Sequence, residues 1–492
     1  MSLVVTPTAP IPRHTFSQFA APGNGKEKFD VSTTLFHYQK KEMLMLSVRL
    51  QDFKCFRDTG EIHIKPITFL VGENSSGKTS FLAALRLSLE CFTSAANNPF
   101  NREPYFLGGF DQIAHASVGG RRRASSFCLS LTHNSPPSRG RNSLHGVRRI
   151  NTTGDATNSH ILRFGKGSPQ PHLVAYSFRH NDLEAEFDLN GDHVECKIGG
   201  VAFKRKRELF LTPAAMIREN PSFLRYIFDE FIHANASRSA VQPPQKPDNM
   251  DALLKLAEGF RSARMSLGQR VFASAPVRSE PLRTYNPSEV AANAQGSHVP
   301  LELAGHKTRS PDRWEKVRQA LSDFGQRAGL FDDIEIRQLG KKDGDPFQIE
   351  VKVGGPLVNI VDVGYGVSQA LPIIYQIQNS RHYDAFLIQQ PEVHLHPRAQ
   401  AELGTLIGAT AVSKDAPYFV IETHSDYILD RIRIEVQEGR VPHDYVGIHY
   451  FSRNGNDVRI SQITLDENGE LDGAPTYFRE FFLSEHRRLL GL

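Results

Sequence analysis

The segment Ile67–Leu89, ITFLVGENSSGKTSFLAALRLSL, decides the fold of this chain. Its apolar run Ile67–Val71 predicts a buried strand, and apolar residues at helical spacing from Phe81 onward predict a helix. Between them, Gly72–Thr79 matches G-x-x-x-x-G-K-[ST] at every fixed position. Because a strand, a glycine-rich turn and a helix follow one another, the segment predicts a phosphate-binding loop in an α/β domain.

The loop's residue types suit a nucleotide triphosphate. Glycine lets the backbone approach the phosphates closely, and successive N–H groups together with the helix N-terminus attract negative charge. Lys78 is expected to reach the β- and γ-phosphates, and the Thr79 hydroxyl to bind Mg²⁺. The residues of the loop predicted to bind ATP are Asn74, Ser75, Ser76, Gly77, Lys78, Thr79 and Ser80.

Length and composition limit the class of protein. A chain of 492 residues with 39% hydrophobic residues is long enough for several domains and a substantial core. The net charge of +4 permits nucleic-acid binding without arguing for it. The four cysteines have no C-x-x-C spacing, which favours free thiols in a reducing cytoplasm. We expect no membrane span and no secretory signal.

The chain divides by composition into four parts. Residues 1–44 are rich in Pro, Thr, Ser and Gly and predict a flexible N-terminal extension, while 45–110 form a first lobe around the phosphate loop. Residues 111–350 predict an insertion of strands followed by helices, and 351–492 a second lobe with a C-terminal tail. The insertion contains a basic run at 121–123 and a polar loop that carries Arg139, Arg141, Arg148 and Arg149.

Three motifs in the second lobe follow the phosphate loop in a fixed order. Gly364–Gln369 precedes a predicted helix, and such a glycine-serine turn suits either an anion or an ordinary helix cap. The apolar strand Ala385–Ile388 runs into Q-Q-P-E-V-H-L-H-P at 389–397. The strand Tyr418–Ile421 runs into E-T-H-S at 422–425. Ligands gather at such strand ends in open α/β sheets.

These motifs resemble those of ABC-type ATPase heads, a group that includes RecF-like, SMC-like and OLD-like proteins. The chain is most similar to a prokaryotic branch of AAA/ABC-type ATPases with a C-terminal domain of unknown function. Ala275–Tyr285 and the P-E-x-H-L-H-P segment carry this resemblance. It implies an α/β fold with a mixed sheet flanked by helices and a mixed α+β insertion. It covers residues 46–90 and 270–490 well and 97–265 only loosely.

The resemblance also implies roles for residues outside the phosphate loop. Gly366, Ser368 and Gln369 would belong to a signature loop that binds the γ-phosphate of ATP held by another subunit. Gln112 would match a glutamine that contacts Mg²⁺. His424 would be a switch histidine that senses the γ-phosphate.

One feature departs from the family pattern. The strand ending at Ile388 should be followed by two acids, the first holding Mg²⁺ through water and the second polarising the attacking water. Gln389 and Gln390 stand at these places, and a neutral amide can neither offset the metal's charge nor act as a base. The chain is therefore a naturally slow ATPase, or Glu392 supplies the carboxylate, or the glutamine is an engineered change. The residues expected to act in catalysis are Gln390, His424 and Glu392, with Gln389 near the metal.

Two classes of function follow from these motifs. The first is an ATP-dependent switch, a homodimer or higher oligomer paired through its heads, that controls a separate effector such as a nuclease or toxin in anti-phage defence. The second is a DNA-repair or DNA-clamping ATPase of RecF-like type, for which the arginines of the insertion would contact phosphates. Salt-dependent DNA binding separates the two.

Overall fold

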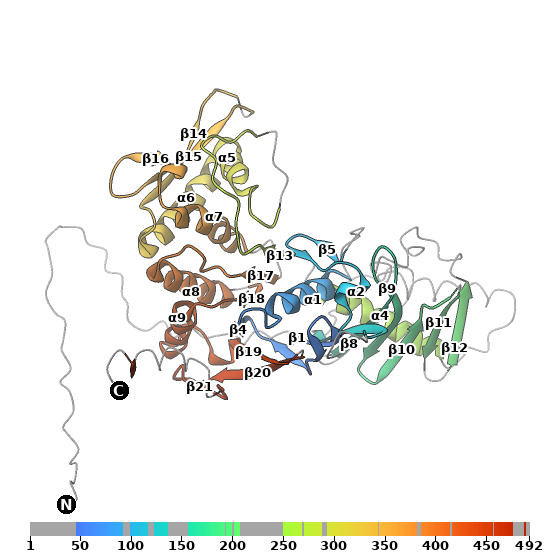
Figure 1. The fold of residues 1–492 in the computed structure, drawn as a ribbon. Coiled ribbons are helices and arrows are strands. Elements are labelled where there is room, and N and C mark those ends of the chain that lie inside the picture. The colour runs from blue at the N-terminus through green and yellow to red at the C-terminus, as the bar shows by residue number, and fades with distance from the viewer. Residues whose placement is uncertain are drawn as a thin grey trace, which may run out of the picture. The chain divides into compact units, whose positions relative to one another are not determined.

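The computed structural model describes residues 46–91, 99–116, 123–135, 156–191, 193–198, 201–206, 249–267, 270–287, 293–342, 344–380, 385–413, 416–455, 457–475 and 487–488. The extension predicted for residues 1–44 lies outside these ranges, as does most of the loop with Arg139, Arg141, Arg148 and Arg149. Figure 1 labels the elements.

The first half of the described chain is mainly strand. Its elements are β1 (Leu46–Phe53), β2 (Phe56–Asp58), β3 (Ile62–Ile64), β4 (Ile67–Gly72), α1 (Lys78–Glu90), β5 (Asn101–Arg102), β6 (Tyr105–Phe106), α2 (Phe110–Ile113), β7 (Ser126–Ser135), β8 (Ala156–Gly165), β9 (His172–His180), β10 (Leu183–Asp188), β11 (His193–Ile198) and β12 (Val201–Lys206).

The second half alternates helices and strands. Its elements are α4 (Asn249–Ser266), β13 (Val271–Ser274), α5 (Val299–Arg309), α6 (Pro311–Ala328), β14 (Asp333–Gln338), β15 (Phe347–Lys352), β16 (Leu357–Asn359), η4 (Ile360–Asp362), α7 (Tyr365–Gln378), β17 (Ala385–Gln389), α8 (Pro397–Ala411), β18 (Tyr418–Glu422), α9 (Asp426–Gln437), η6 (His443–Tyr445), β19 (Val446–Asn454), β20 (Asp457–Leu465) and β21 (Leu471–Asp472).

A seven-stranded mixed sheet holds the phosphate loop. Its strand order is β13-β17-β18-β4-β19-β20-β21. The first five strands are parallel, β20 pairs antiparallel with β19, and β21 pairs antiparallel with β20. The five core residues of β4 are all buried because α1 and α8 both pack against this strand. The predicted α/β head with a mixed sheet flanked by helices is confirmed.

A nine-stranded antiparallel sheet forms a second layer. It runs β12-β11-β10-β9-β8-β7-β1-β2, with β3 paired to β1. Buried and exposed residues alternate along β8 because α4 packs against the β7–β11 strands. Helix α1 contacts β7 of this sheet as well as β4, β13, β17 and β18 of the mixed sheet. The helix of the phosphate loop therefore joins the two layers.

The elements of the predicted insertion are shared among the sheets. β7–β12 belong to the antiparallel sheet, whereas β13 pairs in parallel with β17 at the edge of the mixed sheet. A separate three-stranded sheet, β14-β15-β16, packs against α5 and α6. The boundary predicted near residue 350 stays a prediction, because these contacts describe packing rather than independent folding.

Candidate functional site

The glycines of the phosphate loop are required by its geometry. Gly72 has φ +131°, and a Cβ placed there would lie 2.1 Å from the Phe451 carbonyl oxygen. Gly77 has φ +94°, and a Cβ there would lie 2.5 Å from the Cys55 sulfur. No side chain fits either position without displacing backbone or core atoms. The local backbone therefore confirms why the motif needs glycine at its two fixed positions.

Lys78 lies folded over the loop that precedes it. Its ammonium donates to the carbonyl oxygens of Gly72, at 3.0 Å, and Glu73, at 2.7 Å. The Ser76 hydroxyl also donates to the Glu73 carbonyl, at 2.7 Å. Burial lowers the pKa of Lys78, and the nearby Glu422 carboxylate opposes that shift. A cation held by two carbonyl dipoles at a helix N-terminus is arranged to receive a phosphate group.

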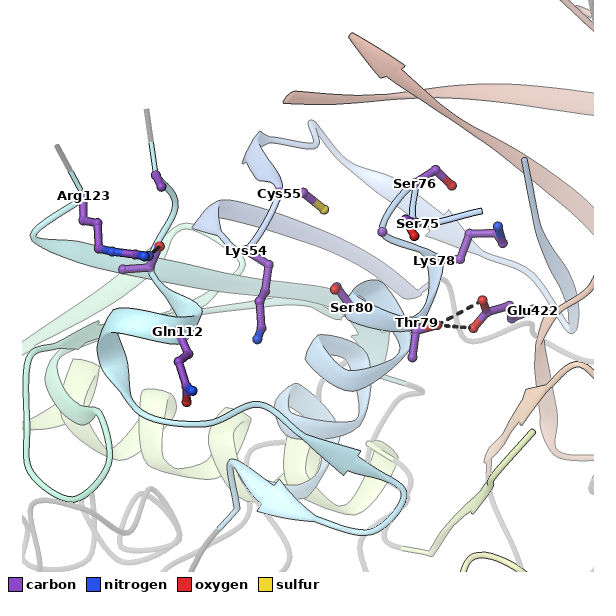
Figure 2. Close-up of a pocket in the computed structure, with 13 residues that line it drawn as sticks. Lys54, Cys55, Ser75, Ser76, Lys78, Thr79, Ser80, Gln112, Arg123 and Glu422 are labelled. Atoms are coloured by element: carbon purple, nitrogen blue, oxygen red, sulfur yellow. Dashed lines mark hydrogen bonds between the residues drawn. The ribbon is translucent and has the colours of Figure 1, made fainter. Parts of the chain in front are cut away.

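A cavity of about 380 Å³ opens beside the loop (Figure 2). Its walls come from the phosphate loop, from the β1–β2 turn, and from the segment after β6. Three cations face it, Lys54, Lys78 and Arg123, against one carboxylate, that of Glu422. Lys54 donates to the Leu107 carbonyl at 2.9 Å and Arg123 to the Ala114 carbonyl at 3.3 Å. Within the described residues none of these three cations forms an ion pair, so the cavity fits a polyanion such as a triphosphate.

Of the predicted nucleotide ligands, the structure brings six to this cavity, together with Gln112, a predicted metal ligand. The predicted residues that line it are Ser75, Ser76, Gly77, Lys78, Thr79, Ser80 and Gln112. Gln112 is held in place because its side-chain oxygen accepts from the Gly109 N–H at 2.9 Å. Asn74 is exposed and is not among the lining residues. The roles assigned to these residues stay predictions.

Glu422 was not anticipated as a site residue. The Thr79 hydroxyl lies 2.8 Å and 3.0 Å from its two carboxylate oxygens (Figure 2). Glu422 is 6% exposed, and burial raises its pKa, with the Thr79 hydrogen bond and Lys78 opposing that shift. A hydroxyl and a carboxylate are hard oxygen donors of the kind that Mg²⁺ prefers. The residues present therefore fit the metal that usually accompanies ATP.

The two glutamines after β17 lie in different surroundings. Gln389 is 4% exposed, its Nε2 has no hydrogen-bond partner, and it lies beside the buried Tyr105 hydroxyl. Gln390 has φ +40°, and its N–H donates to the Glu422 carbonyl at 2.7 Å. A non-glycine residue with positive φ stores backbone strain, which is common at functional turns. The chain thus makes a tight turn where the family pattern has its acidic pair.

Glu392 bonds the end of the neighbouring strand. Its two oxygens accept from the Thr423 hydroxyl at 2.8 Å and from the His424 N–H at 2.7 Å. Burial raises the pKa of Glu392. Partial burial and the charge of Lys78 lower the pKa of His424. Glu392 therefore fixes the backbone that carries the predicted switch histidine, and its own charge opposes the lowering of the Lys78 pKa.

Arg278, from the segment Ala275–Tyr285, connects these turns to helix α7. Its guanidinium donates to the carbonyl oxygens of Gln389 and Gln390, each at 3.4 Å. Its N–H donates to the Gln369 side-chain oxygen at 3.0 Å. Gln369 is 1% exposed, and its side-chain amide donates to the backbone carbonyls of Arg278 and Ser279. Its predicted contact with nucleotide stays a prediction that this packing does not favour.

The predicted signature loop forms the first turn of α7. The Ser368 hydroxyl donates to the Tyr365 carbonyl at 2.8 Å, and Ser368 is not among the residues lining the cavity beside Lys78. A Cβ on Gly366 would lie 2.6 Å from the His394 carbonyl oxygen. The Tyr365 ring packs edge-on against the His394 ring at 4.9 Å. The signature loop therefore packs on the P-E-V-H-L-H-P turn rather than on its own chain's phosphate loop.

Comparisons with known proteins agree with this geometry. An AAA domain model described as putative AbiEii toxin, type IV TA system, matches residues 271–430, and an AAA ATPase domain model matches 43–105. The matched segments contain the phosphate loop and the three later motifs, in agreement with the ATPase head that the sequence predicts.

Three solved SMC heads are similar to the chain in structure. The SmcHead bound to the C-winged helix domain of ScpA has TM-score 0.42 and 10% identity over 86% of this chain and 98% of its own. The Smc head with an extended coiled coil bound to the C-terminal domain of ScpA, from Pyrococcus furiosus, has TM-score 0.39 and 12% identity over 91% and 99%. The SMC head from Thermotoga maritima has TM-score 0.36 and 12% identity over 86% and 99%. No curated protein matches the chain significantly in sequence.

Proposed function

We propose that this chain is an ATP-dependent switch in which two heads pair around ATP and hydrolyse it slowly. The observation that carries the proposal is the separation of the two elements that we predict to bind phosphate. Lys78 and Thr79 face the cavity, whereas Ser368 lies on another turn that is not among the lining residues. A single head then covers only part of a triphosphate, and a second head can supply the signature loop.

Each residue has a defined task in this proposal. The loop N–H groups and Lys78 hold the phosphates, and Thr79 orients Mg²⁺, which would neutralise charge on the phosphate oxygens. His424 contacts the γ-phosphate, and Glu392 holds the backbone of that histidine. Gln390 has no carboxylate with which to take a proton from water, so turnover is expected well below the roughly 10 per second of a median enzyme.

The pairing is tested by measuring mass in solution with multi-angle light scattering. The full chain with ATP and Mg²⁺ should double its mass relative to the nucleotide-free sample. Ser368→Arg should stay monomeric and still bind ATP with an affinity within about threefold of the parent, because the change leaves the cavity intact. A parent chain that binds ATP but keeps the same mass in both conditions would overturn the paired-head proposal.

A role in prokaryotic anti-phage defence, through a separate nuclease or toxin effector, is the biological setting we propose. It is supported by the description of the AAA domain model that matches residues 271–430, which names a putative toxin of a toxin–antitoxin system. Phage plating efficiency on cells carrying the native locus tests it. Protection should disappear with Lys78→Ala, and protection that survives this change would contradict it.

The DNA-clamping alternative is less well supported. Among the arginines that motivated it, Arg123 lies in the described part of the chain, and there it lines the nucleotide cavity. DNA affinity that falls steeply with salt, and that is lost when Arg139 and Arg141 become Glu, would favour the alternative.

No helix in the described residues is long and apolar enough to cross a membrane.

A further inference from the structure

We propose that Glu422, at the end of β18, supplies the carboxylate for the metal bound beside Thr79, in place of the missing acid at Gln389. The inference rests on the proposed ATP binding and concerns how the metal is held. The carboxylate that faces the metal would then lie on β18 instead of on the neighbouring strand β17. Glu392, the carboxylate that the sequence offered instead, has a different task.

The register of the sheet makes the exchange geometrically simple. Gln389 and Glu422 are direct partners on adjacent parallel strands, which lie about 4.8 Å apart. Residues paired in this way place their side chains on the same face of the sheet. In the strand order, β18 lies between β17 and the phosphate-loop strand β4. A glutamate on β18 is therefore one strand nearer to Thr79 than an acid on β17 would be.

The contacts of Glu422 match those expected of a metal-side carboxylate. Both of its oxygens lie within 3.0 Å of the Thr79 hydroxyl, the group predicted to bind Mg²⁺. Glu422 forms no ion pair within the described residues, and Lys78 is the cation whose charge opposes its raised pKa. A buried carboxylate with so little compensation is a favourable neighbour for a divalent cation.

Glu392 is occupied elsewhere. Each of its oxygens already accepts a hydrogen bond from the turn after β18, one from the Thr423 hydroxyl and one from the His424 N–H. Withdrawing either oxygen toward a metal would remove one of the two hydrogen bonds that hold this turn. Glu392 therefore holds the turn Thr423–His424 after β18, and Glu422 remains the carboxylate that contacts Thr79, the predicted metal ligand.

The neutral amide at Gln389 is consistent with this assignment. A second carboxylate beside Glu422 would raise the pKa of both groups, and one of the two would stay protonated. Gln389 is 4% exposed, and its Nε2 lacks a partner. An amide N–H₂ at this place can donate to a carboxylate or to a water without adding charge. Gln389 therefore adds no further carboxylate beside Glu422 and Glu392, and the pKa of Glu422 is already raised by burial and by the charge of Glu392.

The test measures metal binding apart from hydrolysis. Mn²⁺ affinity in the presence of ATP is read from the electron paramagnetic resonance of free Mn²⁺, and ATP affinity without metal from a fluorescent analogue. Glu422→Gln should weaken Mn²⁺ binding by about 10–100-fold, the range for removing a group that orients a metal's ligands. Metal-free ATP affinity should stay within about threefold of the parent. The matched control Glu392→Gln should keep Mn²⁺ affinity within about threefold.

A charge exchange keeps the test decisive. The double variant Glu422→Gln with Gln389→Glu should recover most of the Mn²⁺ affinity, because the carboxylate returns one strand away. Unchanged Mn²⁺ affinity in Glu422→Gln would overturn the inference while leaving the proposed switch intact. Loss of metal-free ATP binding in Glu422→Gln would also overturn it, by showing a role in the fold of the loop. A parent chain that binds no ATP under any condition would instead defeat the proposed function.

Discussion

The two large sheets share helix α1 but place their polar groups differently. In the parallel part of the mixed sheet, the polar residues of the candidate site gather at the ends of the strands, where Gln389, Glu422 and the phosphate loop meet. In the antiparallel sheet, buried polar residues such as His133, Asn158 and His160 lie within the strands. The difference follows from chain direction, since parallel strands all end at one edge and antiparallel strands alternate.

The mixed sheet carries the phosphate loop with its predicted nucleotide-binding residues, and the antiparallel sheet mainly packs against helices. Of the cavity residues with predicted chemistry, those of the phosphate loop come from the edge where parallel strands end, whereas Gln112 comes from α2 beside the β1–β2 turn. The antiparallel sheet contributes the cavity's outer wall through Lys54 and Arg123, and otherwise packs against α1 and α4. Changes in the two layers should therefore separate stability from nucleotide binding.

The largest expected effect is on stability, in the antiparallel layer. Phe178 on β9 is fully buried, with its ring 5.5 Å from that of Phe260 on α4. Phe178→Ala should lower the free energy of unfolding by about 3–5 kcal/mol, because it leaves a cavity between sheet and helix. ATP affinity below the new unfolding midpoint should change by less than about threefold. Urea unfolding and a fluorescent nucleotide titration give the two values, and a parallel loss of affinity would contradict the division of labour.

The next effect is on binding, in the parallel layer. Lys78→Met should weaken ATP binding by at least about 100-fold, roughly 2.7 kcal/mol, by removing the cation that faces the phosphates. Lys65 offers a control, since it is a partly buried lysine beside the same strand whose ammonium, like that of Lys78, donates to a backbone carbonyl, that of Val446, at 3.0 Å. It precedes β4, whereas Lys78 follows that strand.

Lys65→Met should leave ATP affinity within about threefold, and its cost should appear in the unfolding midpoint. If the two lysine variants weakened ATP binding equally, ATP binding would not depend specifically on the edge where the parallel strands end.

The sequence was sufficient for the elements whose pattern is local. The strand, loop and helix from Ile67 to Leu89 follow from apolar spacing and glycine, and the structure has β4 and α1 there. The strand ending at Gln389 and that ending at Glu422 were also predicted from short apolar runs. The strand order does not follow from the sequence, because it depends on pairing between segments more than 300 residues apart along the chain, such as Ile67 of β4 and Phe419 of β18.

For the same reason Glu422 was read only as the residue before Thr423 and His424. Its position next to the phosphate-loop strand, which gives it a contact with Thr79, exists only once β18 lies beside β4. Lys54 and Arg123 were missed similarly, since they reach the cavity from the antiparallel sheet. The P-E-V-H-L-H-P motif predicted a family but could not reveal that Glu392 bonds the turn after another strand.

The smallest expected effect is the loss of stability at low pH, which we compare for one buried histidine from each layer. His133 on β7 and His449 on β19 are each 1% exposed, and burial lowers the pKa of each to about 4. Both are therefore neutral in the folded chain at pH 5, whereas in the unfolded chain, with a pKa near 6.5, they are protonated. The unfolded state binds more protons between pH 6.5 and 4, so stability falls as pH is lowered through this range.

Each histidine should cost about 2 kcal/mol of stability at pH 5 relative to pH 8. His133→Phe and His449→Phe, followed by urea unfolding at both pH values, should each remove about that much of the acid loss. Each ring also donates one hydrogen bond to a backbone carbonyl, His133 through Nδ1 to Asn134 at 3.1 Å and His449 through Nε2 to His63 at 3.0 Å. Either substitution takes a donor away from one carbonyl, so the two variants should lose similar stability at pH 8. An acid loss unchanged in both variants would place the titrating groups elsewhere.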